Sequence, residues 1–227
     1  MVLESNPLMP ADRFPANMRE VVVIDLGTIP HADANLRMRE LQQLRLGEEI
    51  PDTLLFCDHP EIVTLGPAAR RDAVTAPDDY AQVEVDRGGS LTYHGPGQLV
   101  VYPVFRWDLE GESNVKRVTA KLEAWCIEAL AEFNIVAGRD ERMQGVWSGG
   151  HKIGSVGLAF RNWVSRHGFT LNLATTPGRV EGLHGCGLEP GVTTCLLALG
   201  HRVSRPEMIA SLLRTMPLAI GRVEAKS

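Results

Sequence analysis

Cys186 is the residue whose type and surroundings point most directly to chemistry. It lies in the sequence LHGCGLEPG, between Gly185 and Gly187. Glycine on both sides lets the backbone adopt unusual angles and lets a substrate approach the sulfur closely. Two interpretations fit this pattern, a nucleophilic cysteine and a cysteine in a structural turn. The remaining cysteines lie in apolar surroundings typical of buried structural thiols, and they are Cys57, Cys126 and Cys195.

A cysteine nucleophile needs a neighbouring cation, because a thiol with an unperturbed pKa of about 8.5 is mostly protonated at pH 7. A cation that lowers the thiol pKa to about 6 would leave most of it ionised. Lys152 is a candidate, since it enters the apolar segment KIGSVGLAF, where a buried ammonium needs a partner. The other candidate cations are His94, His151 and His184.

Metal and nucleotide sites are disfavoured by the spacing of the same residues. His184 and Cys186 form one close pair of possible ligands, whereas structural zinc sites usually have two such pairs. The segment GGHKIGS lacks the GxxxxGK[ST] spacing of a phosphate loop, and RGGSLTYHGPG lacks the order GxGxxG. The GxSxG pattern of serine hydrolases is absent as well. We therefore expect neither a metal nor a cofactor.

Length, composition and charge are those of an ordinary globular protein. The chain has 227 residues, 44% of them hydrophobic and 22% charged, which is enough for a substantial core. A net charge of −5 disfavours nucleic acid as a partner. The four cysteines form no CxxC pair, which favours a reducing compartment. Without a signal-peptide pattern or a long apolar run, a cytoplasmic location and no membrane partner are expected.

Periodicity predicts three helices and several short strands. The helices are expected over residues 31–46, 113–134 and 206–220. Ser113 or Asn114 can cap the second of them. Apolar or alternating segments predict strands over residues 19–27, 53–57, 61–66, 82–87, 98–105, 135–139, 145–148, 151–161 and 167–173.

The order of these elements predicts an α/β protein of the α+β type. Its sheet should be mixed and mostly antiparallel, with flanking helices, because the elements do not alternate as βαβ units. The sequence DHP between residues 53–57 and 61–66 indicates a hairpin or another tight connection. Residues 1–18 are expected to form a flexible tail and residues 19–227 a single catalytic domain. An alternative division sets off a small C-terminal subdomain from about residue 178.

Several separated segments resemble the octanoyltransferases of lipoate biosynthesis. RGGSLTYHGPGQLVVY, residues 87–102, fits the family signature R-G-G-x-x-T-aromatic-H-x-x-G-Q-x-aliphatic-x-Y at every fixed position. The likeness continues through GVWSGGHKIGSVGLAFRNWVSRHGFTLNL and LHGCGLEPGVTT, and CDHPEIVTLG resembles an early family segment. It extends over about residues 20–215 and departs from the family pattern at Pro67, Asp86 and Gly154.

The resemblance implies the fold of the catalytic domains of biotin and lipoate protein ligases. It also implies an acyltransferase that moves an octanoyl group from octanoyl-acyl carrier protein to a specific lysine of a lipoyl domain, the first step of endogenous protein lipoylation. Cys186 aligns with the family nucleophile, which forms an acyl-thioester, and Lys152 with the residue that lowers the pKa of that thiol. The residues that align with substrate-contacting segments are Arg87, Gly88, Gly89, Ser90, Leu91, Thr92, Tyr93, His94, Ser155, Val156, Gly157, Gly168, Phe169 and Thr170.

The implied acceptors are lipoyl-domain proteins such as the glycine cleavage H protein and the E2 subunits of 2-oxoacid dehydrogenases, and a monomer is expected. Donor and acceptors are typically acidic, so their docking sites should be basic. These basic clusters fit an ordinary solvated surface equally well. The candidate clusters are Arg70 with Arg71, Lys116 with Arg117 and Lys121, and Arg161 with Arg166.

Three alternatives stay open at the level of sequence. An ATP-dependent lipoate or biotin ligase of the same fold would need no cysteine, and its transfer would depend on ATP. A non-catalytic acyl-binding or carrier-binding domain would be indifferent to the loss of Cys186 or Lys152. A thioesterase would release free octanoate, and addition of an apo lipoyl domain would distinguish it from a transferase.

Overall fold

The computed structural model describes residues 18–112, 114–183 and 191–226. The expected N-terminal tail therefore lies outside the described residues, apart from residue 18. In chain order the elements are β1 (Arg19–Thr28), α1 (His31–Leu46), β2 (Asp52–Asp58), β3 (Ile62–Leu65), α2 (Pro67–Arg71), β4 (Gln82–Glu84), β5 (Leu91–His94), β6 (Gln98–Val104), α3 (Val115–Ala131), β7 (Ala137–Asp140), β8 (Met143–Ser148), β9 (His151–Arg161), β10 (Val164–Asn172), α4 (Arg205–Ile220) and β11 (Arg222–Glu224).

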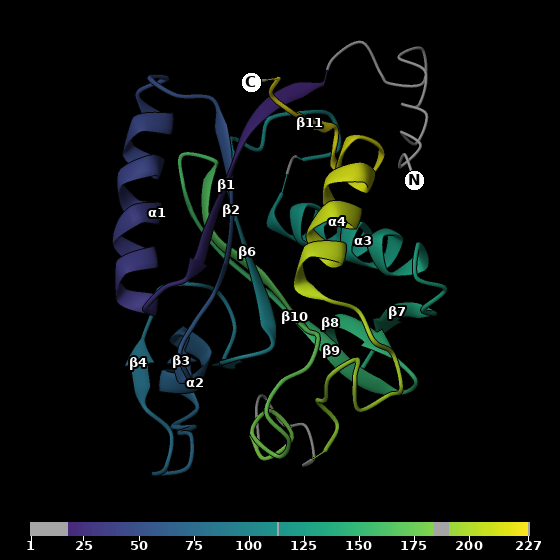
Figure 1. The fold of residues 1–227 in the computed structure, drawn as a ribbon. Helices are drawn as coiled ribbons and strands as arrows, with labels where there is room; N and C mark the ends of the chain where they lie inside the picture. The colour runs from purple at the N-terminus through teal and green to yellow at the C-terminus, as the bar shows by residue number, and fades with distance from the viewer. Residues whose placement is uncertain (1–17, 113, 184–190, 227) are drawn as a thin grey trace.

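Eight strands form the main sheet, in the order β11-β1-β2-β6-β10-β9-β8-β7. β1 runs parallel to both of its neighbours, whereas the pairs from β2 to β7 along this order are antiparallel. Figure 1 shows α1 on one side of this sheet and α3 with α4 on the other. The prediction of a mixed, mostly antiparallel sheet flanked by helices is confirmed.

The central strands β2, β6 and β10 are buried at nearly every position because helices cover both faces of the sheet. Leu54 and Phe56 of β2 belong to the large core shared with α3 and α4, whereas Leu55 and Cys57 belong to the smaller core under α1. Successive strand residues point to opposite faces, so a continuous apolar run requires a packed layer on each side. The segment TLLFC is therefore buried from both directions.

The helix ends follow local capping chemistry. Asn114 caps α3, and its side chain accepts a hydrogen bond of 2.9 Å from a backbone N–H in the first turn. Ser204 and Glu207 form a reciprocal capping box at the start of α4. α4 packs on α3, where the indole N–H of Trp125 donates to the carbonyl of Leu212 at 2.8 Å. In the described parts of the chain, no helix combines the length and apolar character needed to cross a membrane.

A small sheet of β4, β3 and β5 lies beside the main sheet (Figure 1). The prediction of a hairpin between residues 53–57 and 61–66 is wrong, because β2 belongs to the main sheet and β3 to the small one. β3 instead pairs antiparallel with β5, which residues 91–94 of the glycine-rich stretch form. Sequence periodicity does not predict β5, because four residues among glycines carry too little alternation.

Candidate active site

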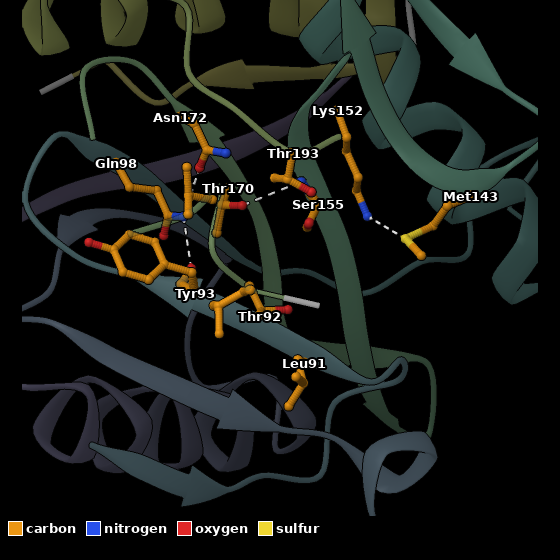
Figure 2. A pocket seen from close by; sticks show the side chains of 12 residues that line it. Leu91, Thr92, Tyr93, Gln98, Met143, Lys152, Ser155, Thr170, Asn172 and Thr193 are labelled. Atoms are coloured by element: carbon orange, nitrogen blue, oxygen red, sulfur yellow. Dashed lines mark hydrogen bonds between the residues drawn. The ribbon is translucent and has the colours of Figure 1, made fainter. Parts of the chain in front are cut away.

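A cavity with two adjoining compartments lies between the small sheet and strands β9 and β10. Both compartments are partly open to solvent, and with the open space at their mouths included they span about 460 Å³ and 310 Å³. Thr92, Ser155 and Thr170 belong to the walls of both. The first compartment, shown in Figure 2, is lined by Leu91, Thr92, Tyr93, Gln98, Met143, Lys152, Ser155, Thr170, Asn172, Val180, Leu183 and Thr193. The second is lined by His31, Thr64, Arg87, Thr92, His94, Tyr102, Ser155, Gly157, His167, Gly168, Phe169 and Thr170.

Lys152 brings a cation to the wall of the first compartment. It is the second residue of β9 and is only 7% exposed. Its ammonium donates to the sulfur of Met143 at 3.0 Å (Figure 2). Its backbone N–H donates to the carbonyl of Val192 at 2.8 Å, and its carbonyl accepts from the N–H of Thr194 at 2.9 Å. These main-chain hydrogen bonds fix the position from which the Lys152 side chain extends. The ammonium at its end carries three donor hydrogens.

Cys186 lies outside the described residues, but the described residues that flank it lie at the cavity. Leu183 lines the first compartment. The N–H of Gly191 donates, at 3.0 Å, to a carbonyl two residues before Leu183, so the two flanks meet. Thr193 also lines the first compartment and forms an isolated parallel bridge with Lys152. The described chain therefore ends and resumes beside the compartment that Lys152 lines.

Arg179 ties the first of these flanks to the small sheet. Its guanidinium donates to the carboxylate of Glu61 at 2.8 and 2.6 Å and also pairs with Asp79. It lies 3.7 Å from the ring centroid of Tyr80. The hydrogen bond from Arg179 lowers the pKa of Glu61, which keeps the ion pair charged at neutral pH. Val180, the next residue, is thereby held in the cavity wall.

Gln98 joins the strands that surround the first compartment. Its amide nitrogen donates to the side-chain oxygen of Asn172 at 2.9 Å and to the carbonyl of Tyr93 at 2.8 Å (Figure 2). Its amide oxygen accepts from Nδ1 of His94 at 3.0 Å. Asn172 donates in turn to the carbonyl of Thr194 at 2.9 Å. The network fixes β5, β6 and β10 relative to the segment that follows residue 190.

Arg87 faces inward, is 6% exposed, and anchors the glycine-rich stretch to β3. Its Nη2 donates to the carbonyl and hydroxyl oxygens of Thr64, at 2.8 and 2.7 Å, and to the carbonyl of Ser90 at 3.0 Å. The N–H of Gly88 donates to the carbonyl of Leu158 in β9 at 2.9 Å. The stretch is therefore held between the small sheet and the main sheet, where it can form a wall of the cavity.

Four histidines are buried in or beside the second compartment, and they are His31, His59, His94 and His167. The ring centroids of the first three lie 5.4 to 5.8 Å apart. Burial is the main cause that lowers the pKa of each, to about 4 for His31, and neighbouring positive groups add to the effect at His31 and His94. These imidazoles are therefore neutral at pH 7.

Polar neighbours hold two of these rings in place. His59 contacts the hydroxyl of Tyr102 at 2.8 Å through Nε2 and the carbonyl of Ile29 at 2.7 Å through Nδ1. His167 donates through Nε2 to the carboxylate of Asp86 at 2.9 Å. Asp86, where the resembling family often has arginine, is an acceptor here, and the hydrogen bond from His167 lowers its pKa.

The cavity brings together most of the residues that the sequence assigned to substrate contact. Those that line it are Arg87, Leu91, Thr92, Tyr93, His94, Ser155, Gly157, Gly168, Phe169 and Thr170. Four others line neither compartment, and they are Gly88, Gly89, Ser90 and Val156. Val156 packs against the large core instead. The predicted contact between substrate and these residues stays a prediction.

Sequence reasoning missed several residues of the wall. Gln98 and Tyr102 could have been found, because both are fixed positions of the signature in residues 87–102. His31 and Met143 gave no local signal, since they reach the cavity from distant parts of the chain. The missed residues are His31, Thr64, Gln98, Tyr102, Met143, His167, Asn172, Val180, Leu183 and Thr193.

The described cysteines and one docking candidate are buried. Cys57, Cys126 and Cys195 are buried free thiols, and burial raises the pKa of Cys57 and Cys126. Arg166 is only 6% exposed and pairs with Asp86. Its assignment to a docking surface is wrong, because its charge is used inside the protein. His184, the remaining metal and cation candidate of that region, lies outside the described residues.

Comparisons with known proteins agree with this architecture. Residues 31–216 match the family described as the lipoyl protein ligase A/B catalytic domain. The octanoyltransferase of Syntrophobacter fumaroxidans is 37% identical over 203 residues, which cover 86% of this chain and 88% of that protein. A structure from the archaeal lipoylation system of Thermoplasma acidophilum, described as a bipartite lipoate protein ligase and its E2 lipoyl domain, aligns with a TM-score of 0.65 at 14% identity, over 93% of this chain and 87% of that chain. The biotin protein ligase of Aquifex aeolicus aligns with a TM-score of 0.52 at 12% identity, over 90% and 69%. These two likenesses concern the fold alone, and they confirm the predicted fold class.

Proposed function

The chain belongs to the octanoyltransferases within the lipoyl protein ligase A/B catalytic-domain family, and from that membership we propose that it transfers an octanoyl group from octanoyl-acyl carrier protein to a specific lysine of a lipoyl domain. The group passes through a thioester on Cys186, assisted by Lys152. Residues 19–227 act as one catalytic domain. The observation that carries the proposal is the buried Lys152 in the wall of a cavity at which both described flanks of Cys186 also lie.

The proposed reaction has two balanced half-reactions. The Cys186 thiolate attacks the thioester carbonyl of the donor, a new carbon–sulfur bond forms, and the carrier thiol leaves with the electron pair and gains a proton. The amine of the acceptor lysine then attacks the acyl-Cys186 carbonyl, the amide forms, and the Cys186 thiolate leaves. The first exchange is nearly isoenergetic and the second runs downhill to the amide, so the transfer needs no ATP.

Lys152 has two tasks in this scheme. Its ammonium favours the ionised form of Cys186, because a positive neighbour stabilises a thiolate. In the first half-reaction that ammonium gives a proton to the departing carrier thiolate, and the neutral amine that remains then takes the proton that the acceptor amine loses in the second half-reaction. Support comes from the burial of Lys152 and from its bridge with Thr193, which joins it to the segment after Cys186.

The described cysteines support the choice of Cys186 as nucleophile. Burial raises the pKa of Cys57 and Cys126, so both thiols are protonated at neutral pH. Cys195 is 4% exposed and lies in the core beside Leu196 rather than in the cavity wall. None of these three thiols lines either compartment.

The first compartment is the proposed site of the octanoyl chain. Its wall offers the apolar side chains of Leu91, Val180 and Leu183 beside small polar ones such as Ser155. The chain would begin beside Lys152 and follow β9, with the glycine-rich stretch as the opposite wall. Of the residues proposed to contact substrate, Leu91, Thr92, Tyr93, Ser155 and Thr170 line this compartment. Arg87, His94, Gly157, Gly168 and Phe169 line the second compartment, and the proposed set also includes Gly88, Gly89, Ser90 and Val156.

The partners follow from this chemistry. The donor is octanoyl-acyl carrier protein, and the acceptors are lipoyl-domain proteins such as the glycine cleavage H protein and 2-oxoacid dehydrogenase E2 subunits. Arg70 and Arg71 are exposed beside the small sheet and remain candidates for docking an acidic carrier. Charge reversal there should raise the KM for the carrier with little change in kcat.

Transfer to an apo lipoyl domain tests the proposal. The purified protein is incubated with octanoyl-carrier protein and the apo domain, with and without ATP, and the mass of the domain is followed. We expect the domain to gain one octanoyl group without ATP, and Cys186→Ser and Lys152→Ala to prevent the gain. Transfer that requires ATP would indicate a ligase instead, and release of free octanoate without modification of the domain would indicate a thioesterase.

A further inference from the structure

The direction of the Lys152 side chain depends on an irregularity in β9. The pairing of β8 with β9 shifts register just before Trp147, which pairs with Lys152. Ile153, the residue that this shift skips, is buried in the large core. Lys152 and Ser155, three positions apart, both line the first compartment. Residues three apart in a regular strand point to opposite faces, so the bulge is what turns Lys152 toward the cavity.

Met143 and Gly145 of β8 enclose the end of the Lys152 side chain. The sulfur of Met143 accepts from the ammonium at 3.0 Å (Figure 2). A Cβ atom at Gly145 would lie 2.6 Å from Cε of Lys152, 3.4 Å from its Nζ and 2.5 Å from the carbonyl oxygen of Gly154. Non-bonded atoms do not pack this closely. The Gly154 carbonyl is held in the sheet, whereas a lysine side chain can rotate, so any side chain at position 145 would displace the lysine.

Gly145 also has a backbone conformation that favours glycine. Its φ is 143°, which residues with a Cβ atom rarely adopt. It lies in the part of β8 where the pairing with β7 shifts register, between the pairs that Met143 and Trp147 form. The space around Lys152 and the irregular backbone beside it therefore have the same origin, namely the glycine at position 145.

Glu123 of α3 fixes this irregular part of β8. Its Oε1 accepts from the N–H of Gly145 at 2.9 Å, and its Oε2 accepts from Nε of Arg139 in β7 at 2.7 Å. The side chain is buried, with 4% of the residue exposed. Hydrogen bonds to a carboxylate are among the stronger ones in proteins. One buried side chain thus joins α3 to both β7 and β8 at the point where their pairing is irregular.

We propose that Gly145, fixed by Glu123, is a positioning residue for Lys152. It leaves the space through which the lysine side chain reaches the first compartment, and it thereby sets the distance between the ammonium and the Cys186 thiol. Neither Gly145 nor Glu123 lines a compartment, so both act through Lys152. This inference rests on the role of Lys152 in the octanoyl transfer proposed above, and it extends the site to β8 and α3.

The thiol pKa of Cys186 tests the proposal, and the pH dependence of alkylation by iodoacetamide measures it in the full chain. Peptide mass mapping assigns the alkylation to Cys186, because the described cysteines are buried. In Gly145→Ala we expect the thiol pKa to rise toward the ordinary value of about 8.5 and alkylation at pH 7 to slow about three- to ten-fold, because the ammonium is displaced. In a Lys152→Ala background, Gly145→Ala should cause no further change.

Two other glycines provide matched controls. Gly200 has a φ of 87° with no atom near its Cβ position, so Gly200→Ala introduces backbone strain without a clash. Gly138 lies in the neighbouring strand β7, has no positive φ, and also has open space around its Cβ position. Gly138→Ala and Gly200→Ala should both leave the thiol pKa of Cys186 unchanged.

Glu123 gives a second route that introduces no strain at position 145. Glu123→Gln keeps an oxygen acceptor for the Gly145 N–H and should retain most of the alkylation rate, whereas Glu123→Leu removes the acceptor and should raise the thiol pKa. This pair decides the question if Gly145→Ala does not fold.

Three results would count against the account. A wild-type thiol pKa in folded Gly145→Ala or folded Glu123→Leu protein overturns the inference. A shift caused by Gly145→Ala that persists in the Lys152→Ala background overturns it as well. A Lys152→Ala protein whose thiol pKa equals that of the wild type overturns the proposed role of Lys152 itself, and with it this inference.

Discussion

Burial decides which residues around the cavity carry charge. His94 was one of the candidate cations that the sequence offered to Cys186, but its ring is buried, and burial lowers its pKa well below the usual range. A neutral imidazole cannot stabilise a thiolate by charge. Arg87 keeps its charge, yet its Nη2 is committed to Thr64 and Ser90 in the second compartment. Among the described residues that line the first compartment, Lys152 is therefore the basic group.

The buried histidines predict a dependence of stability on pH. The pKa of His31 falls from the ordinary 6.5 to about 4 on folding, mainly because the ring is buried. Between these values the unfolded chain binds a proton that the folded protein does not, so the free energy of unfolding falls as the pH drops from 6.5 toward 4. The slope should reach up to about 1.4 kcal/mol per pH unit for each such histidine. His59, His94 and His167 shift in the same direction.

Urea unfolding at several pH values measures this slope, and His31→Gln should reduce it. Carboxyl groups with lowered pKa, such as Asp25 and Asp86, lose their contribution only as the pH falls below the ordinary value of 3.8. They therefore affect stability at more acidic pH than the histidines do. A free energy of unfolding that stays constant between pH 6.5 and 4 would contradict the neutral histidine cluster.

At the scale of elements, the sequence predicts those that have a strong period of their own. α3 and α4 were expected close to their observed bounds, because each has apolar residues at helical spacing and a clear start signal. α1 was expected mainly because Gly47 and Pro51 mark its end. The short strands β5 and β11 were not expected. β11 has only three residues and forms because it pairs with β1 in the folded protein. The assignment of neighbouring strands β2 and β3 to different sheets likewise depends on tertiary contacts that local sequence does not encode.

The segment before residue 184 gives a prediction about positioning. Arg179 joins that segment to Glu61 and Asp79, and its side chain is mostly buried. Arg179→Ala should free the segment, and we expect kcat for acylation of Cys186 to fall roughly ten- to hundred-fold, because small displacements of reacting groups are costly. KM for the carrier should change little, since Arg179 lies at the loop rather than at a proposed docking cluster. Single-turnover acylation with octanoyl-carrier protein measures the effect.

Arg214→Ala is the matched control for this element. Arg214 pairs with Glu132 between α4 and the end of α3, and both side chains are substantially exposed. Its removal should change neither the acylation rate nor the melting temperature by much, because exposed ion pairs contribute little. Equal rates for Arg179→Ala and wild-type protein would exclude the positioning role of Arg179.

At the scale of the whole molecule, a buried network of ion pairs joins the last strand to segments that are far away in the sequence. Arg222, in the last strand, is fully buried and donates to Asp52 at 3.1 Å and to Glu112 at 2.7 Å. Its guanidinium also lies 4.4 Å from the ring centroid of Trp107. The network joins β11 to the start of β2 and to the segment before α3. The cavity has the same global origin, because its wall combines residues from His31 to Thr193.

Removal of Arg222 should destabilise the fold strongly. Arg222→Met keeps much of the side-chain volume but leaves the buried carboxylates of Asp52 and Glu112 with fewer positive partners. We expect a loss of about 3–5 kcal/mol in the free energy of unfolding. Urea unfolding at pH 7 measures it, and Arg222→Lys should recover part of the loss. A change below about 1 kcal/mol, the range of exposed pairs, would show that the network contributes little.

Intact-protein mass spectrometry after incubation with octanoyl-carrier protein tests the central claim most directly. The wild-type protein should gain the mass of one octanoyl group, and peptide mapping should locate it on Cys186. Cys186→Ser should gain nothing, and Lys152→Ala should be acylated at least about ten-fold more slowly at pH 7, because the thiol loses its stabilising cation. An unmodified Cys186 in a protein that still octanoylates a lipoyl domain would contradict the account.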